Sequence, residues 1–319
     1  MPNPSRTWTI AINQTFSSTV DQVVQFQEAV YALKVLMVAA GWTVTLSSNG
    51  TTSSAADNWT SAAALEVNTT GAGAWCVLTS PGGWSSSTAS ILLYINNASA
   101  DTTPQGFVVR GTNGSYTGGS VSALPTASTA ETAVSAAPQA LGHTTAVDAR
   151  YATWRSSRGD VALMVKTAGA STVTNYIAVT SNADGNGGGQ GSNRWWVTQT
   201  SGTSDAMSSS FMTSSSYTSS LTSGGAAAAT TIVTGGLPWA MTSWTSGLDY
   251  TGETIFGVME VGQNSSTTGR QLGQVIDMYS VPTALAFGVL DDSESAQTQR
   301  RVVVGDVAVY APTASLPFA

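Results

Sequence analysis

Charged side chains are scarce in this chain. They make up 9% of its 319 residues, against about 25% in ordinary soluble domains. The surface therefore has to be covered largely by Ser, Thr, Asn and Gln. The formal net charge is only -7, and a weakly charged surface causes little repulsion between copies of a chain. The composition allows close self-association, and we expect packing into an assembly.

Basic residues are the scarcer sign, with 11 Lys and Arg against 18 Asp and Glu. Affinity for nucleic acid depends on clustered cations that release counterions from the phosphates. The adjacent pair Arg300-Arg301 is interpreted as solvated surface. We therefore expect no nucleic-acid partner.

Cysteine and histidine occur once each. Cys76 stands in the apolar run 74–78 and cannot close a disulfide within the chain, which suits assembly in a reducing cytoplasm. His143 has no Gly-x-Ser-x-Gly sequence beside it, so a Ser-His-acid hydrolase is not expected. One Cys and one His cannot complete a tetrahedral transition-metal site.

Long hydrophobic runs are also lacking. The longest apolar stretch, residues 29–42, is interrupted by Lys34 and is too short to cross a bilayer. The first six residues lack the apolar core of a signal peptide. We expect neither a secretory leader nor membrane insertion.

Carboxylates leave one enzymatic alternative, a glycosidase, because that chemistry needs only two acids facing one cleft. Nothing in the sequence pairs the candidates. These are Asp148, Asp160, Asp249, Glu253 and Glu260. We expect no enzymatic activity and assign no catalytic residue.

Two acidic clusters could offer oxygen ligands to calcium. They are Asp184-Gly185-Asn186, and Asp291-Asp292 with Glu294. Neither fits an EF-hand, because in the first loop Trp195 stands where the bidentate Glu is required. Loop tips explain both clusters, so Ca²⁺ has no positive support and we expect no metal or cofactor.

A single amphipathic helix is predicted at about residues 19–40. Its apolar side chains recur at spacings of three and four, which is typical of a helix packed on a sheet or on another molecule. Thr19 is the expected N-terminal cap and Gly41 the expected end. The apolar positions are Val20, Val23, Phe26, Val30, Leu33 and Met37.

After Gly41 the apolar period changes to two, which indicates strands. The predicted strands are 42–46, 74–79, 90–95, 105–110, 151–155, 161–166, 174–180, 195–200, 231–233, 254–261, 274–279, 284–290 and 301–310. Residues 123–141 are interpreted as a connector and 201–225 as a low-complexity tract. The sequence predicts a mainly β fold, an antiparallel β-sandwich or jelly-roll-like arrangement with one N-terminal helix. It forms one large β domain or two, 1–145 and 146–319.

Tryptophan is abundant, with ten residues. Burial in the core or between subunits is the leading interpretation, and a platform for sugar stacking is the alternative. In Trp195-Trp196 the two residues must lie on opposite faces of a strand, so one faces away from its own sheet's core. The interface or glycan candidates are Trp84, Trp195, Trp196, Trp239 and Trp244.

Several short segments resemble virion proteins of tailed bacteriophages. They are Gly41-Trp42-Thr43-Val44, the run 73–82, Tyr116-Thr117-Gly118-Gly119-Ser120 with Pro125-Thr126-Ala127, and Val304-Gly305-Asp306-Val307. In those proteins an N-terminal helix is followed by a Trp-containing strand, a glycine-rich hairpin region and a Thr/Ala-rich connector. The resemblance implies a building block of the particle, present in many copies, and carries over no catalytic residue.

The leading hypothesis is a bacteriophage virion structural protein, made in the host cytoplasm, whose partners are itself and other virion proteins. A tail or baseplate position is favoured over capsid decoration. The alternative is a carbohydrate-binding module or adhesin that recognises a bacterial surface glycan through exposed Trp, Asn and Gln side chains.

Overall fold

The computed structural model describes residues 8–18, 21–54, 56–66, 72–82, 88–95, 107–112, 114–129, 131–133, 150–166, 174–181, 194–200, 207–213, 229–234, 257–264, 269–291 and 299–312. Beyond residue 163, the described side chains are those of Ile177 and Val179. Within these ranges the fold is mainly β, with antiparallel sheets and a single α-helix. This agrees with the predicted fold class at that level.

The described strands include two six-stranded sheets. Sheet A has the order β1 (Trp8–Thr15), β10 (Arg150–Ser156), β11 (Val161–Lys166), β12 (Thr174–Ser181), β13 (Arg194–Thr200) and β14 (Met207–Thr213). Sheet B has the order β3 (Ser53–Ser54), β2 (Thr43–Ser48), β4 (Trp75–Thr79), β5 (Ser90–Ile95), β6 (Phe107–Thr112) and β9 (Glu131–Ala133).

The remaining elements lie around these two sheets. The C-terminal sheet has the order β15 (Ala229–Thr234), β16 (Gly257–Asn264), β17 (Gly269–Asp291) and β18 (Gln299–Pro312). A small ribbon pairs β7 (Tyr116–Thr117) with β8 (Thr126–Ala127), and a 3₁₀ turn, η1, covers Ala62–Ala64.

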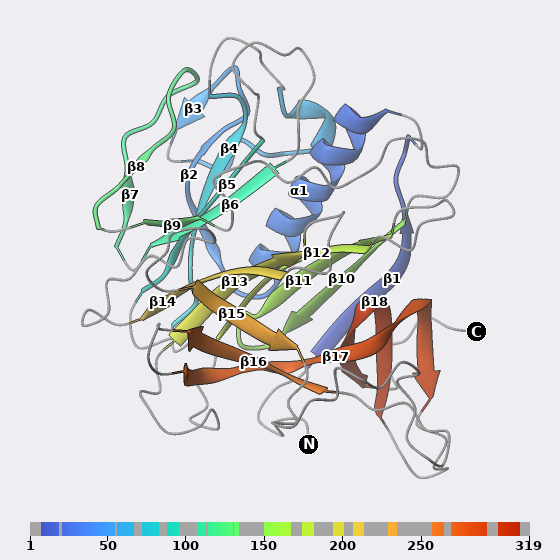
Figure 1. The fold of residues 1–319 in the computed structure, drawn as a ribbon. Helices are drawn as coiled ribbons and strands as arrows, with labels where there is room; N and C mark the ends of the chain where they lie inside the picture. Colours follow the sequence, from blue (N-terminus) through green and yellow to red (C-terminus); the bar gives the residue numbers. More distant parts are fainter. Residues whose placement is uncertain are drawn as a thin grey trace, which may run out of the picture.

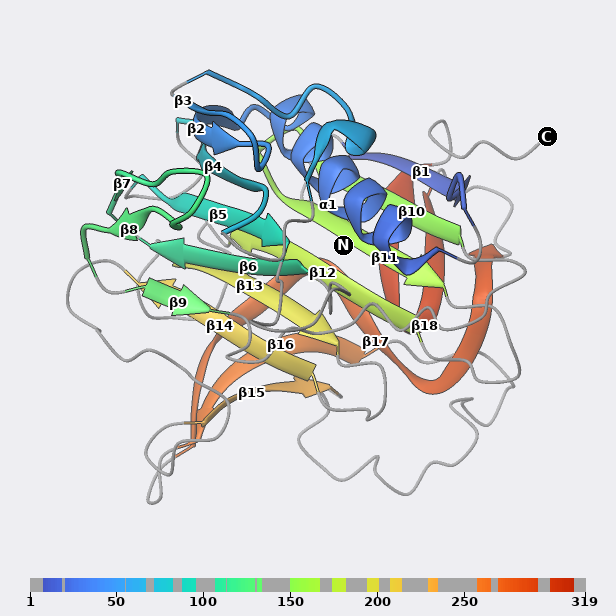
Figure 2. The ribbon, with the colours of Figure 1, turned by 90° about the horizontal axis from the view of Figure 1, so that it is seen from above.

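Helix α1 (Gln22–Ala39) lies between sheets B and A, while the C-terminal sheet lies on the far side of sheet A (Figures 1 and 2). One continuous core contains side chains from all three inner elements. Leu33 of the helix, Leu93 of sheet B and Leu163 of sheet A are among its members. The helix is therefore buried on two sides, which explains why its apolar positions form more than one stripe.

Both ends of α1 are closed by specific contacts. Asp21 is the N-cap, and its carboxylate accepts hydrogen bonds from the backbone N–H groups of Val23 and Val24. The prediction that Thr19 caps the helix was wrong, because Asp21 supplies the side-chain oxygen. At the other end Gly41 has φ +96° and the N–H of Trp42 donates to Met37 O over 3.0 Å, a Schellman ending. The predicted end at Gly41 is confirmed.

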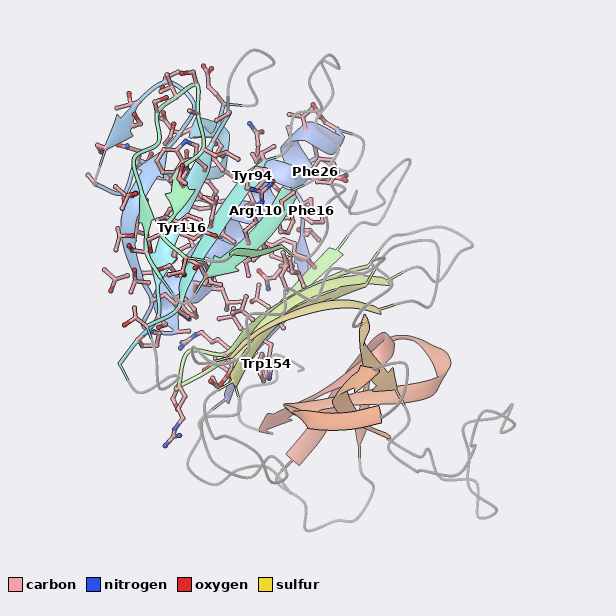
Figure 3. All side chains as sticks on the ribbon, turned by 60° about the vertical axis from the view of Figure 1, so that its left-hand side comes forward. Phe16, Phe26, Tyr94, Arg110, Tyr116 and Trp154 are labelled. Carbon is pink, nitrogen blue, oxygen red and sulfur yellow. The ribbon has the colours of Figure 1, made fainter. Side chains whose placement is uncertain are left out.

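The central strands of sheet B are buried on both faces. On β4, Cys76 and Leu78 belong to the core beneath α1, whereas Trp75 and Val77 belong to a second cluster on the outer face. The β7–β8 ribbon covers that outer face with Tyr116, which packs in one cluster with Tyr94, and Figure 3 shows Tyr116 beside the ribbon. Burial on both faces accounts for the continuous apolar runs in the sequence.

Most predicted strands are present with shifts of a few residues at their ends, but several strands were not predicted. These are β1, β3, β7, β8, β9 and β14. β8 and β9 occupy part of the expected connector 123–141, and β14 lies inside the low-complexity tract. The two strands predicted at 274–279 and 284–290 form one strand, β17, whose pairing with β18 shifts register twice.

β1 pairs antiparallel with β10, with Trp8 opposite Ser156. Residues from both expected domains thus share sheet A. The expected boundary falls in 134–149, outside the described residues, so the division into 1–145 and 146–319 stays a prediction.

Candidate functional site

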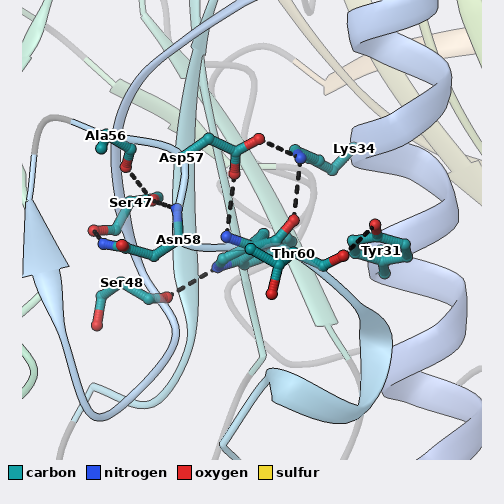
Figure 4. A network of polar contacts seen from close by, with 9 residues as sticks. Tyr31, Lys34, Ser47, Ser48, Ala56, Asp57, Asn58 and Thr60 are labelled. Atoms are coloured by element: carbon teal, nitrogen blue, oxygen red, sulfur yellow. Dashed lines mark hydrogen bonds and ion pairs between the residues drawn. The ribbon is translucent and has the colours of Figure 1, made fainter.

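A network of polar contacts joins α1 and β2 to the segment that follows β3 (Figure 4). We call them the Lys34 cluster. Its members are Tyr31, Lys34, Ser47, Ser48, Ala56, Asp57, Asn58, Trp59 and Thr60.

Lys34 is the charged centre of the cluster. Its side chain is only 8% exposed, although it is a residue type that is almost never buried without a partner. The ammonium contacts Asp57 Oδ2 and donates to Trp59 O over 3.1 Å. It also lies 5.7 Å from the centroid of the Tyr31 ring, within the range of a cation–π contact. These contacts compensate for the lost hydration of the amine.

Trp59 is the apolar anchor of the same cluster. Its side chain is fully buried, its Nε1 donates to Ser48 O over 2.8 Å, and its backbone N–H donates to Asp57 Oδ1 over 3.0 Å. Ser47 Oγ accepts from the N–H of Asn58 and donates to Ala56 O, both over 2.7 Å. The polar atoms are thus occupied in holding the segment to β2 and α1.

The chemistry of this cluster is that of a structural contact. It supplies one buried amine and one carboxylate, Asp57, with a side chain that is 38% exposed. Throughout the described part of the chain, no group of three His, Cys, Asp or Glu residues is arranged to hold a metal ion.

Replacing Lys34 with methionine, which keeps most of the apolar stem, should lower the free energy of unfolding by about 1–3 kcal/mol. The change removes the donor to the buried Trp59 carbonyl and the partner of Asp57. The cost stays below that of a fully buried broken pair because Asp57 can still be hydrated. Urea unfolding followed by circular dichroism measures it, and an unchanged midpoint would contradict the role of the cluster.

The single thiol lies beneath this cluster. Cys76 is fully buried, and burial together with the Asp57 charge raises the pKa of its thiol, while the Lys34 charge opposes the rise. The neutral thiol is therefore favoured in the folded state. The pKa of this thiol is higher in the folded than in the unfolded state. Below the ordinary thiol pKa the thiol is neutral in both states and costs no stability. As the pH rises above that pKa, the unfolded thiol ionises first and the free energy of unfolding falls.

We therefore expect Cys76 to be unreactive in the folded protein and reactive only after unfolding. Thiolate is the reacting species, and both burial and the raised pKa reduce it. Titration with a chromogenic disulfide reagent, with and without urea, measures the difference. Equal rates in the two conditions would contradict the burial of Cys76.

Of the carboxylates considered for a glycosidase, Asp160 has a described side chain. It is fully buried, and Ser156 Oγ donates to its Oδ2 over 2.5 Å within the turn between β10 and β11. Its position is that of a turn-stabilising residue. Glu260 lies in β16, with its backbone alone described. Asp148, Asp249 and Glu253 lie outside the described residues.

The predicted interface tryptophans are placed only in part. Trp195 and Trp196 lie in β13, with Ser181 opposite Trp195 and Thr180 opposite Trp196 on β12. Their side chains are not described, and Trp84, Trp239 and Trp244 lie outside the described residues. The four tryptophans with described side chains, Trp42, Trp59, Trp75 and Trp154, are all buried.

Most of the other polar candidates from the sequence lie outside the described residues. These are His143, 184–186, Asp292 and Glu294, whereas Asp291 ends β17 and pairs with Arg300 of β18 in the register. Sequence reasoning missed Asp57 and Trp59. The signal that could have led to them is Lys34 itself, a charge within an apolar helix that needs a partner.

No helix in the described ranges combines the length and apolar character needed to cross a membrane.

The chain matches no protein-family model, and it matches no curated protein and no solved structure.

Proposed function

We propose that this chain is a non-enzymatic structural protein of a bacteriophage particle, acting as a homo-oligomer through its surfaces. It associates with other virion proteins, and a tail or baseplate position is favoured over capsid decoration. The observation that carries the proposal is that polar side chains of the described residues serve to hold the fold together. Lys34 and Asp57 hold the segment after β3 to α1, and Asp160 stabilises the turn between β10 and β11.

The surface supports the same proposal. Exposed positions in and around β2, β3 and the β7–β8 ribbon are mainly serine and threonine, including Thr51, Ser53, Ser115, Thr117 and Ser122. Such a surface imposes little charge repulsion on neighbouring copies. The scarcity of charge throughout the chain makes the same argument for the remaining surface.

We further propose that sheet A and the C-terminal sheet form an antiparallel β-sandwich, with α1 and sheet B packed on its outer side. β18 approaches β1 and β11, β17 approaches β12, and β15 approaches β14. These approaches between strands of the two sheets support the proposal, because the layers of a sandwich are brought together in this way.

The purified chain should form a defined oligomer. Light scattering gives the molar mass in solution, and electron microscopy shows whether rings, trimers or lattices are present. A monomer at all concentrations would overturn the self-assembling role. A monomer that binds bacterial cells, and is released by a soluble surface glycan, would instead support the carbohydrate-binding alternative.

A further inference from the structure

The turn between β2 and β3 contains the dipeptide Asn49-Gly50. In this dipeptide the backbone nitrogen that follows asparagine is least shielded, because glycine has no side chain. Asparagine is one of the residues that limit the chemical lifetime of proteins. Asn-Gly also occurs at 113–114 and 186–187, where the asparagine lies outside the described residues.

Asn49 is held by its side-chain oxygen and by its backbone in the folded chain. Its Oδ1 accepts from the N–H of Thr51 over 3.0 Å, from Thr51 Oγ1 over 2.9 Å and from the N–H of Thr52 over 2.8 Å. Its backbone N–H donates to Thr52 O, and its carbonyl accepts from the N–H of Glu66 over 2.7 Å. These contacts fix both the side chain and the main chain at this residue.

Gly50 is fixed as firmly. Its N–H donates to Ser48 Oγ over 3.1 Å, and its φ of +97° belongs to the region that favours glycine. A Cβ at this position would lie 2.6 Å from Glu66 Cβ. The close approach that requires glycine therefore also gives the turn its most reactive dipeptide.

We propose that Asn49-Gly50 is a latent modification site that the folded turn keeps closed. When the turn opens, the backbone nitrogen of Gly50 attacks Cγ of Asn49 and loses its proton. The new N–C bond closes a succinimide ring, and the side-chain nitrogen leaves as ammonia. Water then opens the ring, which yields aspartate or isoaspartate at position 49.

The isoaspartate product would be incompatible with the present turn. Isoaspartate adds one methylene group to the main chain, which displaces the contact between Asn49 O and the N–H of Glu66. The neighbouring Ser48 carbonyl accepts from Trp59 Nε1. The lesion therefore weakens the Lys34 cluster and favours further opening of the same segment.

The first experiment compares the full chain, folded and in urea, during incubation in mildly alkaline buffer. Peptide mapping by mass spectrometry follows the amide-to-acid conversion at Asn49, and chromatography separates aspartate from isoaspartate. Conversion should be at least about tenfold slower in the folded protein, since it proceeds through local opening. Equal rates, or faster conversion in the folded protein, would overturn the proposal.

A pair of variants tests whether the Lys34 cluster keeps the turn at Asn49-Gly50 closed. Lys34→Met releases the segment that carries Trp59 and should accelerate conversion at Asn49 several-fold. Val38→Ala is the matched control, because Val38 lies on the same helix with an exposed side chain, and its rate should equal that of the unchanged protein. Equal rates in the two variants would refute gating by the Lys34 cluster, and the comparison with urea remains decisive if Lys34→Met fails to fold.

Discussion

Replacing Trp59 with alanine should lower the free energy of unfolding by about 3–5 kcal/mol. The indole is fully buried and belongs to the core that joins α1 to both sheets. Its removal leaves a cavity that the surrounding strands cannot fill. It also leaves the Ser48 carbonyl, which accepts from Nε1 over 2.8 Å, without that donor.

Urea unfolding followed by circular dichroism measures this loss. Trp59→Phe is the matched control, because it keeps most of the ring volume and removes the N–H donor. It should cost about 1–2 kcal/mol. If phenylalanine and alanine destabilised the protein equally, the hydrogen bond rather than the packing would carry the contribution of Trp59.

The position of α1 could be predicted because Phe26, Val30, Leu33 and Met37 are buried at the expected spacing. Its first residue could not. Thr19 and Asp21 are both residue types that cap helices, and the choice between them depends on three-dimensional contacts. Asp21 is held in place by Ser18 Oγ, which accepts from its backbone N–H over 3.0 Å.

Some strands could likewise be predicted from the sequence, and others could not. β4 and β5 have continuous apolar sequences because both of their faces are covered. β1 was not predicted, although Trp8, Ile10 and Ile12 recur at every second position as in a strand. Its partner β10 lies far away in the sequence. β14 contains three consecutive serines and owes its strand conformation to pairing with β13.

The Lys34 cluster shows the limit for a polar site. The sequence marks Lys34 as an anomaly within an apolar run. It does not say which acid meets the amine, because Asp57 lies in a segment without periodicity, 23 residues away. Loop geometry decides that pairing, and a single sequence does not reveal it.

Replacing Trp154 with alanine should likewise cost about 3–5 kcal/mol. Val161 and Leu163 of β11 belong to the core beneath α1. Ala162 lies between them and opposite Trp154, so these two residues share the other face of sheet A. Trp154 is nonetheless fully buried. The C-terminal sheet lies on that side (Figure 3), so the indole should hold it to sheet A.

Limited proteolysis distinguishes that role from a local packing defect. Trp154→Ala should accelerate cleavage within the last ninety or so residues before the N-terminal part is cut, because the released sheet opens first. Trp154→Phe, which preserves an aromatic ring beside the small Ala162, should retain most of the resistance. If alanine reduced global stability while cleavage began equally in both parts, the C-terminal sheet would not depend on Trp154 for its attachment.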